Sequence, residues 1–311
     1  MVKRQQQPLI SIVLVISLST LLATCHFASD LHSERLFLVK AALQPITLMT
    51  LSLLIVYAAF VKHKWLVYAV VYAIIVNVAF LLPNINMKTK SDAASNTIRV
   101  ATFSTLTRTS NVLDIVNFAV SEAPDILCLQ EVAANDRREL INRLSSDYPY
   151  YVQNNNNQII FSHLSLTVVD DSGYYLASNV LHPKMGKLTL VNTHMPRPYL
   201  SEGVSSEWGA FLDFIDNDSN IIICGDLNIT PNNSLYETLK YQYHLKDSLT
   251  QGYGFTYPNA QRRSALVGPL IRIDYILSRH LSSANTRTIN ASNLSDHRAV
   301  ISDLTIEKNN N

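Results

Sequence analysis

The sequence predicts an α/β domain of stacked, partly antiparallel sheets covered by helices, preceded by three transmembrane helices. Two observations support this prediction. The first 90 residues contain three long apolar stretches, whereas the residues that follow alternate between short strand-like runs and amphipathic helical stripes. Charged residues make up only 16% of the 311 residues, against about 25% in typical soluble domains, so the chain is not an ordinary soluble protein throughout.

The three apolar stretches cover residues 9–25, 36–60 and 65–82, and we expect each to cross a membrane as a helix. Each is close to the roughly 20 residues that a helix needs to cross the hydrocarbon core of a bilayer. A soluble core of helices is a poor alternative, because all faces of the stretches are apolar and their connections are short. A cleaved signal at residues 1–25 is also a poor alternative, since two further stretches follow it. Residues 1–83 therefore form the expected membrane domain.

Charge is distributed unequally along the chain. Residues 1–90 hold 8 Lys and Arg against 2 Asp and Glu, a net charge of +6, whereas residues 91–311 hold 17 against 22, a net charge of −5. Basic residues accumulate in the cytoplasmic segments of membrane proteins. Lys3 and Arg4 and the basic turn at residues 62–64 therefore favour a cytoplasmic amino terminus. Three spans would then place the large domain in the periplasm of a bacterium, attached to the inner membrane.

A polar segment at residues 84–97 is expected to link the membrane domain to the domain at residues 98–306, and residues 307–311 form a tail. Within the domain, an opening strand, helix and strand precede several short strands, which are followed by helices that alternate with strands. The expected strands are 98–103, 125–130, 158–161, 166–169, 179–181, 188–193, 221–224, 271–277 and 298–306, and the expected helices are 111–123, 205–215 and 234–243. Cys128 and Cys224 fall in apolar strands, so we expect two buried free thiols and no disulfide.

Four short polar clusters end or interrupt apolar strands, and a further carboxylate lies within a strand. Side chains at strand ends project into clefts at the edge of a sheet, where binding and catalytic residues concentrate. Each cluster alone has an ordinary structural explanation, such as a turn, a helix cap or a core histidine. The candidate residues are Glu131, His194, Asp226, Asn228, Asp296 and His297 in the four clusters and Asp274 within the strand.

Together, these residues supply hard oxygen ligands and two imidazoles, with no cysteine at a strand end. Oxygen ligands select Mg²⁺ or Mn²⁺ over zinc, and Mg²⁺ is typically held by one or two carboxylates and by phosphate oxygens of the substrate. Histidines beside such an ion suit general acid–base catalysis near neutral pH. The set therefore predicts metal-assisted hydrolysis of a phosphoester, with Mg²⁺ or Mn²⁺ as the cofactor.

The motifs VATFS, DILCLQE, VNTHMP, IICGDLN, RIDYIL and SDHRAV, in this order, resemble those of the endonuclease/exonuclease/phosphatase superfamily. That superfamily includes abasic-site endonucleases, deoxyribonucleases, neutral sphingomyelinases and inositol-polyphosphate phosphatases. The resemblance covers residues 98–306. It implies a four-layer α/β sandwich, in which two packed mixed sheets are flanked by helices and a cleft lies at one edge of the sheets.

The resemblance also implies roles around the metal. Glu131 matches the metal-binding glutamate of the family, and Asp296 matches a carboxylate near the metal. Ser104 stands where the family usually has asparagine, at the end of the first strand. A serine hydroxyl cannot reproduce the paired carbonyl and NH₂ groups of an amide, but it can reach Mg²⁺ through a water molecule.

The remaining roles implied by the resemblance concern water and phosphate. Asp226 matches the aspartate that positions or activates the attacking water, and Asn228 matches the asparagine that holds a phosphate oxygen. His297 matches the histidine that acts as a base or binds phosphate, and Asp274 matches the aspartate that orients it. His194 matches a histidine of the deoxyribonuclease and sphingomyelinase branches and is a candidate general acid for the leaving group.

Several functions remain as alternatives at this point. A membrane-facing phosphodiesterase or phosphatase ranks slightly above a nuclease, because the domain carries a net charge of −5 and its only basic doublets are Arg137-Arg138 and Arg262-Arg263. A catalytically impaired, membrane-anchored interaction protein finds support only in Ser104. A transporter is disfavoured, because the spans hold almost no ionisable residue besides Lys40. The expected partners are the lipid bilayer and a phosphoester, nucleic acid is not favoured, and the sequence predicts no oligomeric state.

Overall fold

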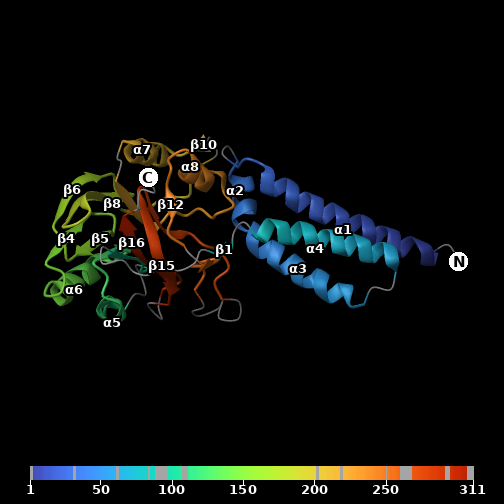
Figure 1. Ribbon diagram of the computed structural model, residues 1–311, viewed down its shortest axis with the longest axis horizontal. Helices are drawn as coiled ribbons and strands as arrows, with labels where there is room; N and C mark the ends of the chain where they lie inside the picture. The colour runs from blue at the N-terminus through green and yellow to red at the C-terminus, as the bar shows by residue number, and fades with distance from the viewer. Residues whose placement is uncertain are drawn as a thin grey trace.

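In the computed structural model, a bundle of helices projects from one end of a layered α/β domain (Figure 1). The bundle contains α1 (Lys3–Phe27), α3 (Leu43–Ala58) and α4 (Lys64–Leu81), and the short helix α2 (Glu34–Ala41) lies where the bundle meets the domain (Figure 1). The structure describes residues 3–30, 33–60, 63–82, 85–87, 97–106, 111–200, 203–217, 220–249, 251–259, 268–290 and 295–306.

The second expected span is not one continuous helix. Helix α2 ends at Ala41 and α3 begins at Leu43, with an angle of 52° between the two apolar stretches. Pro45 explains the break, because a proline ring clashes with the carbonyl four residues earlier, here that of Ala41, and cannot donate a hydrogen bond to it. In the described part of the chain, Leu9–Phe27 and Lys64–Leu81 are each long and apolar enough to cross a membrane. A third span requires the bent pair to count as one.

Lys40, which the sequence predicts to lie within a membrane span, faces the α/β domain instead. Its side chain is buried, and its Nζ lies 3.7 Å from Oδ1 of the buried Asp30. The same Nζ donates hydrogen bonds to the backbone oxygen of Ala28 and to the hydroxyl of Ser234, which belongs to the domain. The break at Ala41 produces this difference, since it turns α2 away from the direction of α3.

The domain contains two six-stranded sheets that mix parallel and antiparallel neighbours. The first sheet has the order β12-β14-β11-β8-β7-β6, and the second has the order β15-β16-β2-β3-β5-β4. The strands of the first sheet are β6 (Leu166–Asp171), β7 (Tyr175–His182), β8 (Gly186–His194), β11 (Ile221–Asp226), β12 (Lys246–Asp247) and β14 (Asp274–Ser278). Those of the second are β2 (Thr97–Ser104), β3 (Ile126–Gln130), β4 (Tyr150–Gln153), β5 (Ile159–Ser162), β15 (Leu281–Ile289) and β16 (Ala299–Ile306).

Apolar side chains fill three layers between these elements. Residues such as Val100 and Ile126 of the second sheet meet Leu190 and Ile222 of the first sheet in the central layer. Helices α7 (Ser206–Asp216) and α8 (Ser234–Tyr241) cover the outer face of the first sheet, and α5 (Val112–Glu122) and α6 (Ala134–Leu144) cover that of the second. The predicted arrangement of two mixed sheets flanked by helices is thereby confirmed.

Several elements differ from the sequence prediction. Helix α6 and strand β15 were not predicted, because α6 is largely polar, with only Leu140 and Leu144 buried, and β15 is rich in serine and threonine. The expected linker includes the short strand β1 (Asn86–Met87), which pairs with β13 (Gln251–Gly252) of the domain. The rest of that linker from residue 88 to 96, and the tail at 307–311, lie outside the described residues.

The prediction of two free thiols in the core is also wrong. Cys128 of β3 and Cys224 of β11 form a disulfide across the central layer, with Cα atoms 6.7 Å apart. Both residues are fully buried, as expected. The sequence cannot reveal the pairing, because the two residues are 96 positions apart and only the stacking of the sheets brings β3 opposite β11.

We expect Gly225→Ala to destabilise the fold. Gly225 has a φ of +136°, and a Cβ there would lie 2.0 Å from the backbone oxygen of Thr193 on the neighbouring strand. A left-handed conformation and a backbone clash together should lower the free energy of unfolding by about 2–4 kcal/mol. Denaturant unfolding of the full chain in detergent measures this change.

Gly209→Ala is the matched control for this substitution. Gly209 lies within α7, and a Cβ there would meet nothing within 4 Å. Alanine favours a helix over glycine, so this variant should match or exceed the wild-type stability by up to about 1 kcal/mol. A Gly225→Ala protein as stable as the control would contradict the assigned conformation.

Candidate active site

Three neighbouring strands of the first sheet bring three predicted site residues together. Asp226 is the last residue of β11, and it pairs in register with His194 at the end of the parallel strand β8. On its other side, Asp226 pairs with Asp274, the first residue of the antiparallel strand β14. Because parallel strands end, and an antiparallel neighbour begins, at the same edge of a sheet, this register gathers the three side chains there.

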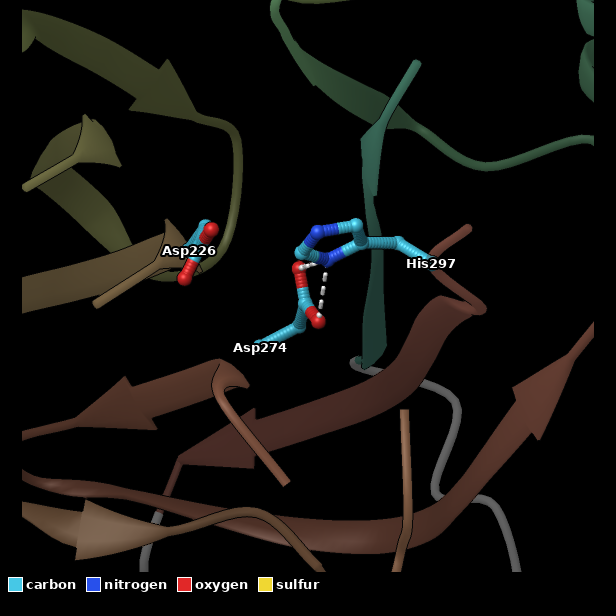
Figure 2. Close-up of side chains that lie close together, drawn as sticks. All are labelled: Asp226, Asp274 and His297. Carbon is cyan, nitrogen blue, oxygen red and sulfur yellow. Dashed lines mark hydrogen bonds and ion pairs between the residues drawn. The ribbon is translucent and has the colours of Figure 1, made fainter. Parts of the chain in front are cut away.

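The second sheet adds the imidazole of His297 to this group. His297 precedes β16, and its Nδ1 lies 2.9 and 3.1 Å from the two carboxylate oxygens of Asp274 (Figure 2). The other ring nitrogen points away from Asp274, on the side of Asp226 (Figure 2). All three residues are buried, and the group could hold a metal ion, since one potential ligand atom of each lies within 4.8 Å of the others. The hydrogen bonds to Asp274, however, already occupy Nδ1 of His297.

A second polar group forms where β3 ends. Nε2 of His194 lies 3.4 Å from Oε1 of Glu131, the residue that follows β3. The hydroxyl of Ser104 donates a hydrogen bond of 3.4 Å to the same oxygen, and the backbone oxygen of Ser104 accepts one from Ser295. Ser104 is fully buried, so it contacts the glutamate from behind. The hydroxyl thus serves to orient the Glu131 carboxylate.

Two site residues adopt backbone conformations that are rare outside glycine. Glu131 has a φ of +56° and Asn228 a φ of +52°. Such residues cost free energy and persist where surrounding contacts impose them, often at functional sites. For Asn228 the contacts are known, since its backbone N–H donates to Oδ1 of Asp226 and its side-chain Nδ2 donates to the backbone oxygen of Met195. The tight turn after β11 therefore fixes both the aspartate and the asparagine.

Asp296 places a carboxylate next to His297. Its Oδ1 lies 4.0 Å from Nε2 of His297, and this oxygen is buried without a hydrogen-bond partner. A buried carboxylate oxygen without a partner is costly, and a bound cation would satisfy it. The donor set of Glu131 and Asp296 therefore fits a hard divalent cation such as Mg²⁺ or Mn²⁺.

Burial and neighbouring charges change the pKa values of the site. Burial, with the nearby Asp274, raises the pKa of Asp226 to about 8. Burial alone would lower the pKa of His297, but the carboxylate of Asp274 raises it to about 10. For His194, burial lowers the pKa, against an opposing effect of Glu131. One imidazole is thus held as a cation while the other is held neutral, which gives them different chemical roles.

A pocket of about 300 Å³ connects these groups. Six of the predicted site residues line it, whereas Ser104 and Asp274 are buried behind those residues. The six are Glu131, His194, Asp226, Asn228, Asp296 and His297. The structure therefore brings together, in one cavity, residues from four separate motifs and both sheets.

The pocket also contains residues that the sequence analysis did not identify. Arg197 and Tyr257 line it, and the ring of Tyr257 packs against His297 with 5.0 Å between centroids. Arg197 follows His194 by three residues. Its closeness to the end of a predicted strand was the sequence signal that could have identified it as a pocket residue. Tyr257 lies in an irregular segment, and no periodicity marks it. Phe37, Leu38 and Ala41 of α2 also line the pocket, although the sequence placed them in a membrane span.

A family model described as the endonuclease/exonuclease/phosphatase family matches residues 77–297. The chain belongs to this family. Its members are metal-dependent phosphoesterases and nucleases, and the family is generally one of hydrolases that act on phosphoester bonds. No curated protein matches the chain.

Solved structures of this family have the same fold. The chain is similar to an endonuclease/exonuclease/phosphatase from Bacteroides vulgatus (19% identity, TM-score 0.52, 68% of this chain and 100% of that one). The chain is also similar to an endonuclease/exonuclease/phosphatase from Beutenbergia cavernae (18% identity, TM-score 0.51, 68% of this chain and 72% of that one). A family protein from Leptotrichia buccalis is similar as well (14% identity, TM-score 0.51, 68% of this chain and 100% of that one). Identities this low establish the fold of the domain, and its substrate has to be inferred from the site.

The charged state of His297 leads to a pH-dependent contribution to stability. The pKa of His297 rises from 6.5 to about 10 on folding, so the folded state binds the proton more tightly than the unfolded state does. The resulting stabilisation of the folded state is complete below pH 6.5. This contribution disappears as the pH rises towards 10. We therefore expect the difference in unfolding free energy between wild type and His297→Gln, measured in a metal chelator, to be largest at pH 6 and to shrink by pH 10. A difference that stays constant over this range would contradict the ion pair with Asp274.

Proposed function

We propose that the protein is a membrane-anchored phosphodiesterase that depends on Mg²⁺ or Mn²⁺ and hydrolyses its substrate by in-line attack of water. The observation that carries this proposal is the convergence of Glu131, His194, Asp226, Asp296 and His297 in one pocket. A binding protein has no chemical need for three acidic side chains beside a neutral and a charged imidazole. The alternative of a non-catalytic interaction protein is weakened further by Ser104, which contacts Glu131 where an asparagine would otherwise stand.

Glu131 and Asp296 are the residues that would hold the metal ion. Bound there, the ion would stabilise the negative charge that develops on the phosphate oxygens during attack. Ser104 orients the Glu131 carboxylate, and the buried Oδ1 of Asp296, which has no hydrogen-bond partner, leaves a donor atom available for a ligand at that side of the pocket. We favour these two residues over the group that includes Asp274, because that aspartate already binds His297.

The other site residues act on the phosphate and the water. Asp226, fixed by the N–H of Asn228, positions the water for attack, and the side chain of Asn228 holds a phosphate oxygen. His297, kept charged by Asp274, donates a hydrogen bond to the phosphate from Nε2. His194 assists the leaving oxygen, because a bound phosphate raises the proton affinity of a nearby imidazole. Positioning and charge stabilisation supply most of the catalysis in this arrangement.

A nuclease of the same family is the second candidate. The domain has a net charge of −5, which does not favour binding to a polyanion. Arg137 and Arg138 line a different pocket, formed by α6 and the segment after β4, and Arg137 binds the backbone oxygen of Asn154 there. The doublet at residues 262–263 lies outside the described residues. The phosphodiesterase proposal therefore stands ahead of the nuclease.

The first test is hydrolysis of bis(p-nitrophenyl) phosphate, p-nitrophenyl phosphate and plasmid DNA by the full chain in detergent, with Mg²⁺, Mn²⁺ or a chelator. We expect metal-dependent turnover of the diester, faster than that of the monoester. His297→Ala should reduce turnover at least about 100-fold, because it removes a charge at the phosphate. His163→Ala, at a half-exposed histidine beside the other end of β3 from Glu131, should leave turnover unchanged.

Each outcome of this assay decides between the candidates. Cleavage of plasmid DNA in preference to the small diester would favour the nuclease. Absence of turnover both in wild type and in Ser104→Asn would overturn the enzyme proposal in favour of the interaction protein. Normal turnover by His297→Ala would refute the role given to that residue.

We also propose that the domain lies in the periplasm. The basic residues near the amino terminus favour this orientation, and the disulfide between Cys128 and Cys224 suits an oxidising compartment. In protein purified from bacterial membranes and denatured without reductant, we expect a maleimide to label Cys25 alone. All three cysteines should react after reduction, as intact-mass measurements would show. Labelling of three thiols before reduction would contradict a periplasmic domain.

A further inference from the structure

Helix α2 forms one wall of the catalytic pocket. Phe37, Leu38 and Ala41 line the same cavity as Glu131 and His297. The lining of this cavity also includes the apolar side chains of Leu106, Ile271 and Ile273. Polar groups able to bind a phosphate thus share the pocket with an apolar surface, part of which comes from outside the α/β domain.

Packing of Phe37 fixes α2 against the domain. The side chain is buried in the apolar cluster that also contains Leu235 and Leu239 of α8. The backbone oxygen of Phe37 accepts a hydrogen bond of 3.2 Å from Nδ2 of Asn233, the residue before α8. Two elements far apart in the sequence are therefore joined by both apolar and polar contacts.

A buried ion pair fixes the same helix at its ends. Asp30, fully buried, accepts hydrogen bonds from Nδ2 of Asn233 and from the backbone N–H of Ser234. Lys40, near the end of α2, pairs with Asp30 and donates to the hydroxyl of Ser234. Movement of α2 away from the domain would remove the hydrogen bonds of Asn233 and Ser234 to the buried Asp30 carboxylate and is therefore unfavourable.

The pocket therefore lies next to the start of an apolar helix. Ala41 lines the pocket, and α3 begins two residues later, at Leu43. Helix α3 then runs away from the domain together with α1 and α4 (Figure 1). If these helices cross the bilayer, the wall formed by α2 lies at the boundary between the membrane and the domain.

From this geometry we infer that the substrate is a lipid phosphoester that remains in the bilayer, with the apolar segment next to its phosphate packed against Leu38 and Ala41. This inference rests on the proposed phosphodiesterase function. Leu38 is suited to the role because its side chain is 46% exposed although it lines the pocket. Burial of each CH₂ group of a tail against such a surface favours binding, so a tail strengthens binding without any further polar contact.

Two diesters with the same leaving group test the inference. Methyl p-nitrophenyl phosphate is soluble, whereas hexadecyl p-nitrophenyl phosphate can be incorporated into phosphatidylcholine vesicles that carry the full-length protein. Leu38→Gln should reduce kcat/KM for the hexadecyl ester about tenfold or more and leave that for the methyl ester within twofold. Val39→Gln is the matched control, because Val39 is the next residue, is 42% exposed and does not line the pocket. It should leave both rates unchanged.

The outcomes separate this inference from the function on which it rests. Absence of metal-dependent hydrolysis of both esters by wild type would overturn the proposed phosphodiesterase. Hydrolysis of the methyl ester with equal effects of Leu38→Gln on both esters, or with no effect, would overturn the role of α2 alone. An equal loss in Val39→Gln on the hexadecyl ester would do the same, because it would attribute the effect to the membrane surface rather than to the pocket wall.

Discussion

The site depends on the register of three strands, β8, β11 and β14. A shift of β14 by one residue relative to β11 would turn Asp274 to the opposite face of the sheet and leave His297 without its carboxylate. Gly225, one residue before Asp226, contributes to this register, because its positive φ and its lack of a Cβ allow the backbone of β11 to lie close to Thr193 on β8. Chemistry at the edge of this sheet is therefore a consequence of backbone pairing deep in its interior.

The two sheets must also be held in a fixed relation, because each supplies part of the pocket. Beneath the site, Nε2 of Gln130 on β3 donates to Oδ1 of Asn192 on β8, at 2.6 Å. The Nδ2 of Asn192 donates in turn to the backbone oxygens of Leu129 and Ile159. Together with the disulfide between β3 and β11, these buried bonds connect the sheets next to the residues that form the site. Polar groups in the central layer thus contribute positional precision that apolar contacts alone do not impose.

The sequence predicted the residues that line the candidate pocket better than it predicted the elements around them. Asp226, His194 and Glu131 were identifiable because each ends an apolar strand, a local pattern that the chain displays directly. The pairing of Cys128 with Cys224 could not be identified from the sequence, because it depends on which strands face each other across the two sheets. Helix α6 and strand β15 were missed for another reason, since their polar composition hides the few residues that they bury. The expectation of one continuous helix over residues 36–60 was wrong because it rested on mean apolarity and did not weigh Pro45, which ends α2 at Ala41.

Attachment of the domain through α2 differs physically from attachment through a flexible linker. A flexible linker would leave the pocket free to face any direction, whereas the hydrogen bonds of Asn233 and Ser234 to Asp30 and the pairing of β1 with β13 hold the domain against the bundle at two places. The ion pair of Asp30 with Lys40 lies within this one segment and adds little net stability, because desolvation offsets most of the attraction between the charges. The hydrogen bonds of Asn233 and Ser234 to Asp30 form in only one arrangement of α2 on the domain, so they favour a defined orientation. The position of the candidate active-site pocket beside α2 gives this orientation a consequence, because it decides which molecules reach Glu131 and His297.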